Sequence, residues 1–293
     1  RYNQADEHLT DIKLKFVVGH DMLQTIHFLT ESGAKTTVEN ISRAYVNCPN
    51  DYFTVLEEVK KACKKLADDE ILSLSGDEYR ITSETQQRIF EMMANYDGIA
   101  NYRIKGEITK EVKKMQLVRQ AQTITADSGN VTFALQTDGG EPLNTGGNPN
   151  MKVVFHDILN VKPSLGEYVD KVKEETQSDK NTICVIPSPD YASEIQQAAE
   201  TILRILYIKD VPNLTDEEKK VVAEIVGTLE DKTRQLEQAI VKSYDEGRLV
   251  YLYNVSIMQQ QNAPQIIKDT ELKMYDNIYT KRLGGSLKDS VAL

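Results

Sequence analysis

The feature that most constrains the fold of this 293-residue chain is an amphipathic helix that runs directly into a β-hairpin, over residues 52–82. Within 52–68, apolar residues recur at the three- and four-residue spacing of one helix face: Val55, Leu56, Val59, Ala62, Cys63 and Leu66. Alternating apolar residues then flank a Gly-containing turn at 75–78, which predicts strands at 71–74 and 79–82. The helix and the hairpin must pack together, because almost no chain separates them.

Two shorter helices are predicted before this unit. Apolar residues at helical spacing predict the first over 21–31, and Gly33 ends it. Thr36 and Glu39 have the spacing of a capping box, which predicts a second helix over 37–45. Three short helices closed by a hairpin are typical of the winged form of the helix-turn-helix.

The rest of the chain alternates between strand and helix patterns. Helices are predicted over 83–95 and 103–120, and a second hairpin over 122–126 and 131–136. Residues 138–150 are rich in Gly, Pro and Asn and predict a mobile loop or a linker. Further strands are expected at 152–156, 182–186 and 249–253, and helices at 165–175, 191–208 and 215–244, the last opened by a Thr215/Glu218 capping box.

Continuous apolar strands that are separated by helices favour a mainly parallel sheet with helices on its faces. The predicted fold class is therefore mixed α/β: a winged helix-turn-helix followed by a small, mainly parallel α/β sheet domain with a long helix. We expect a winged-helix module at 1–97, a connecting helix at 98–121 and the α/β domain at 122–293. The last forty residues have weak periodicity and carry no prediction.

Composition places the chain among ordinary soluble proteins, with 40% hydrophobic and 27% charged residues. Its three cysteines, Cys48, Cys63 and Cys184, form no CxxC pair, which favours a reducing compartment over a zinc or redox site. No run of eighteen apolar residues and no signal-peptide core is present, so we expect a cytoplasmic protein without a membrane partner. The chain begins at Arg1, not Met, and we expect an interior piece of a larger protein.

Charge is distributed unevenly along the chain. Residues 1–120 hold 17 Lys+Arg against 19 Asp+Glu, a balance of −2, whereas residues 121–293 hold 18 against 26, a balance of −8. The N-terminal part can therefore approach a polyanion with little overall repulsion, whereas the C-terminal part is poorly suited to direct DNA contact.

No self-sufficient active site is visible in the sequence. The Gly pairs at 139–140, 146–147 and 284–285 lack the Lys-Ser/Thr of a phosphate-binding loop, so we expect no cofactor in this chain. The four histidines lack metal-ligand spacing, and we expect them to be solvated or core residues. Ser188 follows a strand but lacks a G-x-S-x-G elbow, and a helix entry with Asp190 as the cap is the favoured interpretation. We therefore predict no catalytic and no metal-binding residue.

The helix at 52–68 carries the candidate binding residues. Lys60, Lys61, Lys64 and Lys65 lie on the side opposite its apolar face, where a winged helix usually enters the major groove of DNA. Arg80 on the hairpin, with Lys35 and Arg43 near the second helix, would add phosphate contacts. In the alternative interpretation, Glu57 and Glu58 pair with Lys61, Lys60 and their neighbours at helical spacing. Many winged helices also bind a protein instead of DNA.

The segment at 62–84, ACKKLADDEILSLSGDEYRITSE, resembles the winged helix that follows the ATPase core in the large P-loop ATPases of BREX phage-defence systems, the BrxC/PglY family. In that family a helix ending in L-v-d-d-g-i-L runs into a wing reading g-d-E-Y-R-l-t, and the matching residues here are 66–72 and 76–82. The later order is also similar, through NTICVIPSPDYASEIQQAAETI at 181–202 and GRLVYLYN at 247–254.

The resemblance implies that the parent protein is an ATPase that uses ATP and Mg²⁺ and acts on DNA with other defence proteins. The family's Walker motifs have no matching positions here, so no catalytic residue carries over. This chain would then be a non-catalytic region that binds double-stranded DNA or a partner. A protein-docking module of another AAA-type ATPase or regulator is the alternative, and a free-standing enzyme is a third possibility.

Overall fold

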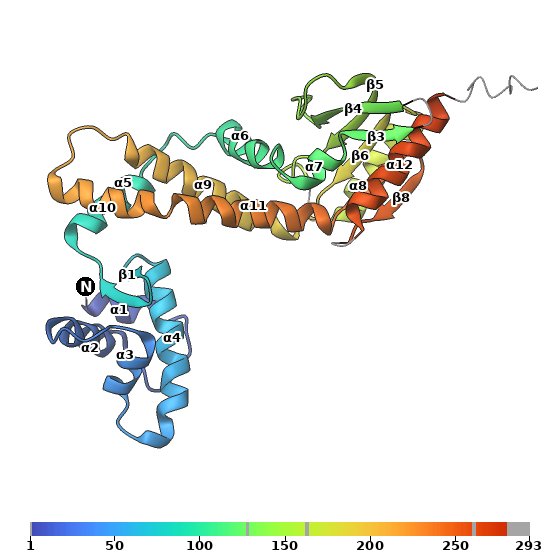
Figure 1. Cartoon of the computed structure of the whole chain (residues 1–293). Helices are drawn as coiled ribbons and strands as arrows, with labels where there is room; N and C mark the ends of the chain where they lie inside the picture. Colours follow the sequence, from blue (N-terminus) through green and yellow to red (C-terminus); the bar gives the residue numbers. More distant parts are fainter. Residues whose placement is uncertain (1, 127–128, 162–163, 260–261, 280–293) are drawn as a thin grey trace, which may run out of the picture. The chain divides into compact units, whose positions relative to one another are not determined.

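A computed structural model describes residues 2–126, 129–161, 164–259 and 262–279 of the chain. It is a mixed α/β protein that divides into two compact units (Figure 1). Unit 1 comprises residues 1–95 and 211–224, and unit 2 comprises residues 96–210 and 225–293. Each unit is described by itself.

Unit 1 is mostly helical and closes its core with a two-stranded hairpin. Its elements are α1 (Tyr2–His8), α2 (Gly19–Glu31), α3 (Val38–Tyr45), the short 3₁₀ turn η1 (Pro49–Asp51), α4 (Tyr52–Asp68), β1 (Leu72–Ser75), β2 (Glu78–Ile81), α5 (Glu84–Ala94) and most of α10 (Asp216–Gly227). The predicted helices and hairpin are confirmed to within a few residues.

The apolar face of α4 forms the centre of the unit 1 core. Val55, Val59 and Leu66 are buried there, together with Met22 and Ile26 of α2. The hairpin pairs antiparallel, from Leu72 opposite Ile81 to Ser75 opposite Glu78. Because the strand pair follows α4 directly, its first buried residues extend the core that the helix begins.

The start of α3 differs from the prediction by one residue. Thr37, not Thr36, is the N-cap, and its hydroxyl accepts the backbone N–H of Asn40. Thr36 is instead buried, and its carbonyl accepts the N–H of Tyr79 on β2, which leaves it outside the helix. This bond joins the segment before α3 to the hairpin.

The second segment of unit 1 begins with the predicted capping box. The Glu218 carboxylate accepts the backbone N–H of Thr215 at 2.8 Å, and the Thr215 hydroxyl accepts the N–H of Glu218 at 3.2 Å. Glu218 is buried and also pairs with Arg88 of α5 at 3.1 Å. The start of α10 is thus fixed to α5 by an ion pair.

Unit 2 is built on a six-stranded sheet in the order β3-β4-β5-β6-β7-β8. The strands are β3 (Thr123–Ala126), β4 (Gly129–Thr137), β5 (Asn148–Phe155), β6 (Thr182–Ile186), β7 (Arg248–Tyr251) and β8 (Asn254–Ile257). The helices are α6 (Asn101–Val112), α7 (Gln116–Gln120), α8 (Leu165–Thr176), α9 (Ala192–Lys209), α11 (Leu229–Asp245) and α12 (Ala263–Ile278), with the 3₁₀ turn η2 (Pro189–Tyr191). The predicted 127–130 turn falls partly outside the described residues.

The sheet is mixed, and the expectation of a mainly parallel sheet is wrong. Only β4–β5 and β5–β6 pair in parallel, whereas both edge pairs and β6–β7 are antiparallel. One helix, α8, connects β5 to β6 and returns the chain for a parallel strand. The connection from β6 to β7 runs through α9, α10 and α11. A contact of 2.9 Å between the Tyr191 hydroxyl and Glu246 joins the start of α9 to the end of α11. The chain therefore returns to the sheet at the same end of the strands from which it left after β6, and β7 consequently runs antiparallel to β6 (Figure 1).

The glycine-rich segment connects two strands of this sheet and is no linker between domains. After β4 it runs back along that strand, with Leu143 donating its N–H to the carbonyl of Leu135. Gly147 passes so close to β4 that a Cβ there would lie 2.3 Å from the carbonyl oxygen of Phe133. Only glycine fits that approach, so the composition of the loop reflects packing against the sheet.

The two faces of the sheet are covered differently. On one face, Val153, Phe155 and Ile183 pack in a large core with α6, α9, α11 and α12. On the other face, Val154 and Cys184 form a small core under α8. Alternate residues of one strand therefore enter different cores, as the period of a strand requires.

Two predicted helices are each interrupted. The helix expected over 103–120 ends at Val112 and resumes at Gln116, because Met115 has an extended ψ of 139° that no helix allows. The helix expected over 215–244 is divided at Thr228, directly after Gly227. Gly lowers helix propensity by about 1 kcal/mol relative to Ala, which makes this point the weakest of the segment.

Candidate functional site

The exposed face of α4 is the site that the sequence predicted. Lys60, Lys61 and Lys64 are all exposed, opposite the buried face of the helix. Among the described residues no ion pair engages these three lysines. Their ammonium groups are therefore available to a phosphate or a carboxylate of another molecule.

The fourth lysine is placed differently. Lys65 is half-buried, and its Nζ lies 2.8 Å from Asp69, whose other oxygen lies 2.9 Å from Nδ1 of His8. The hydrogen bond to Asp69 raises the pKa of Lys65. Asp69 therefore joins the end of α4 to His8 of α1, and Lys65, which pairs with it, is less available to a ligand than the other three lysines.

The predicted pairing of Glu58 with the lysines of α4 is wrong. Its carboxylate accepts the backbone N–H groups of Lys15, Phe16 and Val17, at 2.9, 2.8 and 3.2 Å. Those amides precede α2 and have no helical partner. Glu58 is therefore turned toward the core side of α4 and leaves the lysines unneutralised.

The remaining predicted cations lie on three other segments of unit 1. Arg80 is exposed on β2 and pairs with Glu78 at 3.3 Å. Lys35 is exposed beside Thr36, whose carbonyl bonds β2, so it lies on the backbone segment next to the hairpin. Arg43 is exposed on α3 and donates a long, 3.5 Å hydrogen bond to Asn40. Surface pairs of this kind are weak and can open to a stronger anion.

An apolar side chain shares the exposed face of α4. Phe53 is 77% exposed, and its spacing from Lys60 and Lys64 places the three on one side of the helix. Leu74 on β1 is exposed as well. A large exposed aromatic beside cations is a feature that pure phosphate binding does not require, and it points to an apolar contact.

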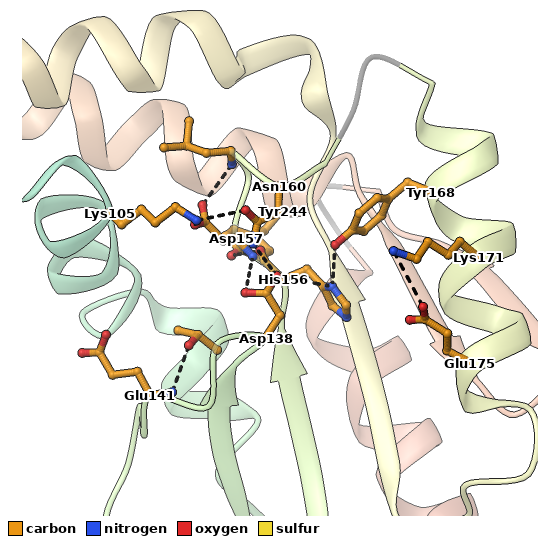
Figure 2. A network of polar contacts seen from close by, with 12 residues as sticks. Lys105, Asp138, Glu141, His156, Asp157, Asn160, Tyr168, Lys171, Glu175 and Tyr244 are labelled. Atoms are coloured by element: carbon orange, nitrogen blue, oxygen red, sulfur yellow. Dashed lines mark hydrogen bonds and ion pairs between the residues drawn. The ribbon is translucent and has the colours of Figure 1, made fainter. Parts of the chain in front are cut away.

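Unit 2 contains a polar network that sequence reasoning did not find. It lies where the parallel strands β4 and β5 end, the edge at which α/β sheets usually bind ligands (Figure 2). Asp138, just after β4, accepts the backbone N–H of Asp157 at 3.2 Å and the amide of Asn160 at 2.8 Å. Lys105 of α6 reaches both Asp157 and Asn160 at 2.9 Å. The network therefore fastens the loop after β5 to β4 and α6.

His156 lies at the centre of this network and is a core histidine. It is 9% exposed, and its Nδ1 lies 3.0 Å from the Tyr168 hydroxyl of α8 and 3.9 Å from Asp138. Burial lowers its pKa, although Asp138 and Glu175 oppose the change, so the ring is neutral at pH 7. Its Nε2 is buried without a hydrogen-bond partner among the described residues. Burial also raises the pKa of Tyr168 to about 12, which keeps that hydroxyl protonated.

The expected cap after β6 is Ser188, not Asp190. Its hydroxyl accepts the N–H of Asp190 and donates to that residue's carboxylate at 3.0 Å, while its backbone N–H donates to the carbonyl of Ser243. Ser188 is buried and fully engaged in closing the strand end. Its contacts are those of a helix entry, as the sequence favoured.

Asp138 and His156 share a property: each directly follows the last residue of a strand, Thr137 of β4 and Phe155 of β5. The patterns that predicted strands at 131–136 and 152–156 therefore placed both residues near strand ends, but did not show that the two strands are adjacent and parallel. That adjacency, which depends on the return of 138–147 along β4, brings the two side chains together.

Comparisons with protein-family models, with curated proteins and with solved structures find no match to this chain. Within the described ranges, no cluster of three or more His, Cys, Asp and Glu is placed to hold a metal ion. Nor does any helix in the part of the chain that the structure describes have the length and apolar character to cross a membrane.

Proposed function

We propose that unit 1 is a winged-helix module that binds double-stranded DNA through the exposed face of α4. The observation that carries the proposal is the set of exposed lysines, Lys60, Lys61 and Lys64, without an ion pair in the described structure. The order α2, α3, α4 and hairpin is that of a winged helix-turn-helix, in which the third helix enters the major groove.

The remaining cations would position the DNA backbone. Arg80 on the hairpin would contact a phosphate beside the groove, as wings commonly do, and Lys35 lies on the neighbouring segment. Arg43 on α3 would approach the backbone from the helix before. Contacts of this type give affinity and orientation without base specificity.

We further propose that this module belongs to a larger BREX-type anti-phage ATPase. The support is the resemblance of the 62–84 segment and the similar order of the later segments. In that setting the parent protein would supply ATP and Mg²⁺ chemistry, and the described units would hold DNA or another defence protein. The chain's own lysines, not a nucleotide, would carry the contact.

The test is duplex binding by the full chain, measured by fluorescence anisotropy over a salt series. The wild-type chain should bind at low salt, and its affinity should fall steeply as salt increases, because counterions are released from each phosphate. The triple variant Lys60→Glu, Lys61→Glu, Lys64→Glu should lose binding. Substitution of one lysine by Gln should reduce the slope of log K against log salt by about one.

A matched variant controls for total charge. Lys180, Lys242 and Lys273 are exposed on unit 2 and form no ion pair in the described structure. Their combined change to Glu alters net charge equally and should leave most of the affinity. Absence of duplex binding by the wild-type chain at low salt, or equal loss in both triple variants, would reject the proposal.

A protein-docking role is the second candidate, and the exposure of Phe53 favours it. A partner with an apolar pocket and a carboxylate rim would use the aromatic ring and the lysines together. In that case Phe53→Ala should weaken binding to the partner by more than tenfold, as for a central aromatic contact, whereas duplex binding should change little.

A further inference from the structure

Unit 2 contains a cavity that takes no part in the sites described above. Its volume is about 320 Å³, at the lower end of the range of about 300–1,000 Å³ that small-molecule sites occupy. Its lining residues come from α7 and the residue before it, the second half of α11 and the first turn of α12, all of which belong to unit 2.

One wall of the cavity is a regular row on α11. Glu237, Val241 and Asp245 line it and follow one another at intervals of four residues, which places them along one side of the helix. The Cα positions of the two acidic residues are therefore separated by about 12 Å along the helix axis, at 1.5 Å per residue. The apolar Val241 lies midway between them, so the row presents an acidic group at each end and apolar surface in the middle.

The other lining residues also include both apolar and polar side chains. Leu117 and Met115 are buried and present apolar surface to the cavity, and Pro264 of α12 adds to it. Gln116 and Gln120 of α7 bring side-chain amides to the same space. Amide oxygens accept hydrogen bonds, so these residues offer both a surface for methylene groups and acceptors for N–H donors.

The α11 row carries two acidic side chains, Glu237 and Asp245. Neither Glu237 nor Asp245 forms an ion pair in the described part of the chain. Burial, and then the charge of the neighbouring Glu246, raise the pKa of Asp245. A cation placed in the cavity would reverse that shift, because it would stabilise the ionised carboxylate.

We propose that this cavity binds a linear aliphatic diamine with a long methylene chain. An ammonium group at each end would face Glu237 and Asp245, and the methylene chain between them would lie on Val241 and Leu117. The spacing of the two acidic residues favours a long molecule with an ammonium group at each end over a molecule with a single ammonium group. The charge on both carboxylates selects a cation over a neutral chain of the same length.

The experiment is isothermal titration calorimetry of the full chain with 1,8-diaminooctane, in about 0.15 M salt to screen diffuse attraction between exposed charges. One equivalent should bind, and butylamine and the neutral 1,8-octanediol should bind at least about tenfold more weakly. The double variant Glu237→Gln, Asp245→Asn should weaken binding of 1,8-diaminooctane by about tenfold or more, and each single variant should lie between wild type and the double variant.

Two further variants keep the result interpretable. Asp170 and Glu174 are exposed on α8, four residues apart and outside the cavity, so Asp170→Asn, Glu174→Gln makes the same charge change and should leave binding within about twofold. Val241→Phe would fill the cavity without altering charge and should abolish binding in a chain that still melts cooperatively. No detectable binding of 1,8-diaminooctane, equal weakening in the α8 variant, or equal binding of the diol would each overturn the proposal.

Discussion

The two units use a helical glutamate in opposite ways. In unit 1, Glu58 of α4 accepts three backbone N–H groups from the segment before α2. In unit 2, Glu271 of α12 is completely buried, and neither of its oxygens has a hydrogen-bond partner among the described residues. Burial raises the pKa of Glu271 to about 9, against the small opposing effect of Lys268. It is therefore a neutral acid at pH 7.

The comparison teaches that the position of a carboxylate on an amphipathic helix does not determine its effect on stability. Glu58 lies next to a segment whose amides lack partners, so its charge is stabilised and it organises that segment. Glu271 lies among Ile267, Met274 and Tyr275, which offer its oxygens no backbone donor from their own helix. One glutamate therefore contributes to folding at neutral pH, and the other opposes it.

The largest expected effect comes from replacing Glu271, whose carboxylate must take up a proton when the chain folds at pH 7. Folding raises its pKa, so the contribution to stability is fully present below pH 4.5 and is lost as pH rises toward about 9. At pH 7 the free energy of unfolding is therefore about 3 kcal/mol lower than it is at acidic pH. Glu271→Gln, which cannot ionise, should therefore raise the free energy of unfolding of unit 2 by about that amount at pH 7, and by almost nothing at pH 4.

Denaturant titrations at pH 4 and pH 7 check this expectation. Glu174→Gln on the exposed surface of α8 is the control and should change stability by less than about 0.5 kcal/mol at either pH. Equal stability of wild type and Glu271→Gln at pH 7 would mean that the carboxyl finds a donor or water in solution, and the contrast between the two glutamates would disappear.

A smaller loss is expected when Glu58 is removed. Glu58→Ala should lower the stability of unit 1 by about 2 kcal/mol, because hydrogen bonds to a charged acceptor contribute about 1.5–3 kcal/mol. Amide hydrogen exchange should accelerate at residues 15–17 in particular. Glu57→Ala, at the exposed neighbouring position, should change neither quantity. Protection of 15–17 that survives in Glu58→Ala would show that other groups hold the segment.

The smallest expected effect concerns the capping box at the start of α10. Thr215→Ala removes the acceptor for the N–H of Glu218 and should cost about 1 kcal/mol. Exchange of the first α10 amides measures it. Thr201→Ala, which removes only a hydroxyl bond to the preceding turn of α9, provides a comparison that should cost less. A larger effect at Thr201 would contradict the assignment of Thr215 as a cap.

Local patterns predicted local structure well. The apolar stripe from Val55 to Leu66, the hairpin that follows it and the Thr215/Glu218 capping box all depend on residues a few positions apart, and all three are confirmed. The strand at 182–186 was predicted to the residue for the same reason. Such features are set by side-chain spacing and need no knowledge of the rest of the chain.

What depended on distant segments was not predictable. The orientation of β7 depends on two helices packing back to back, and the pairing of Glu58 depends on amides more than forty residues earlier. The network around His156 requires β4 and β5 to be neighbours, which the glycine-rich loop allows only by lying against the sheet. The lysines of α4 were found because their exposure follows from the helix itself, and their DNA-binding role stays a prediction.

Unit 1 is assembled from two separate stretches of sequence, 1–95 and 211–224. The backbone consequently passes between the units three times, so neither can be released by a single cut. A truncation after residue 95 would remove Glu218 and leave Arg88 without its acidic partner. Deletion of 211–224 would likewise remove Glu218 and shorten the connection between α9 and α11. Neither unit is therefore a single continuous segment that could be produced alone, and the effect of a mutation in either unit has to be measured in the intact polypeptide.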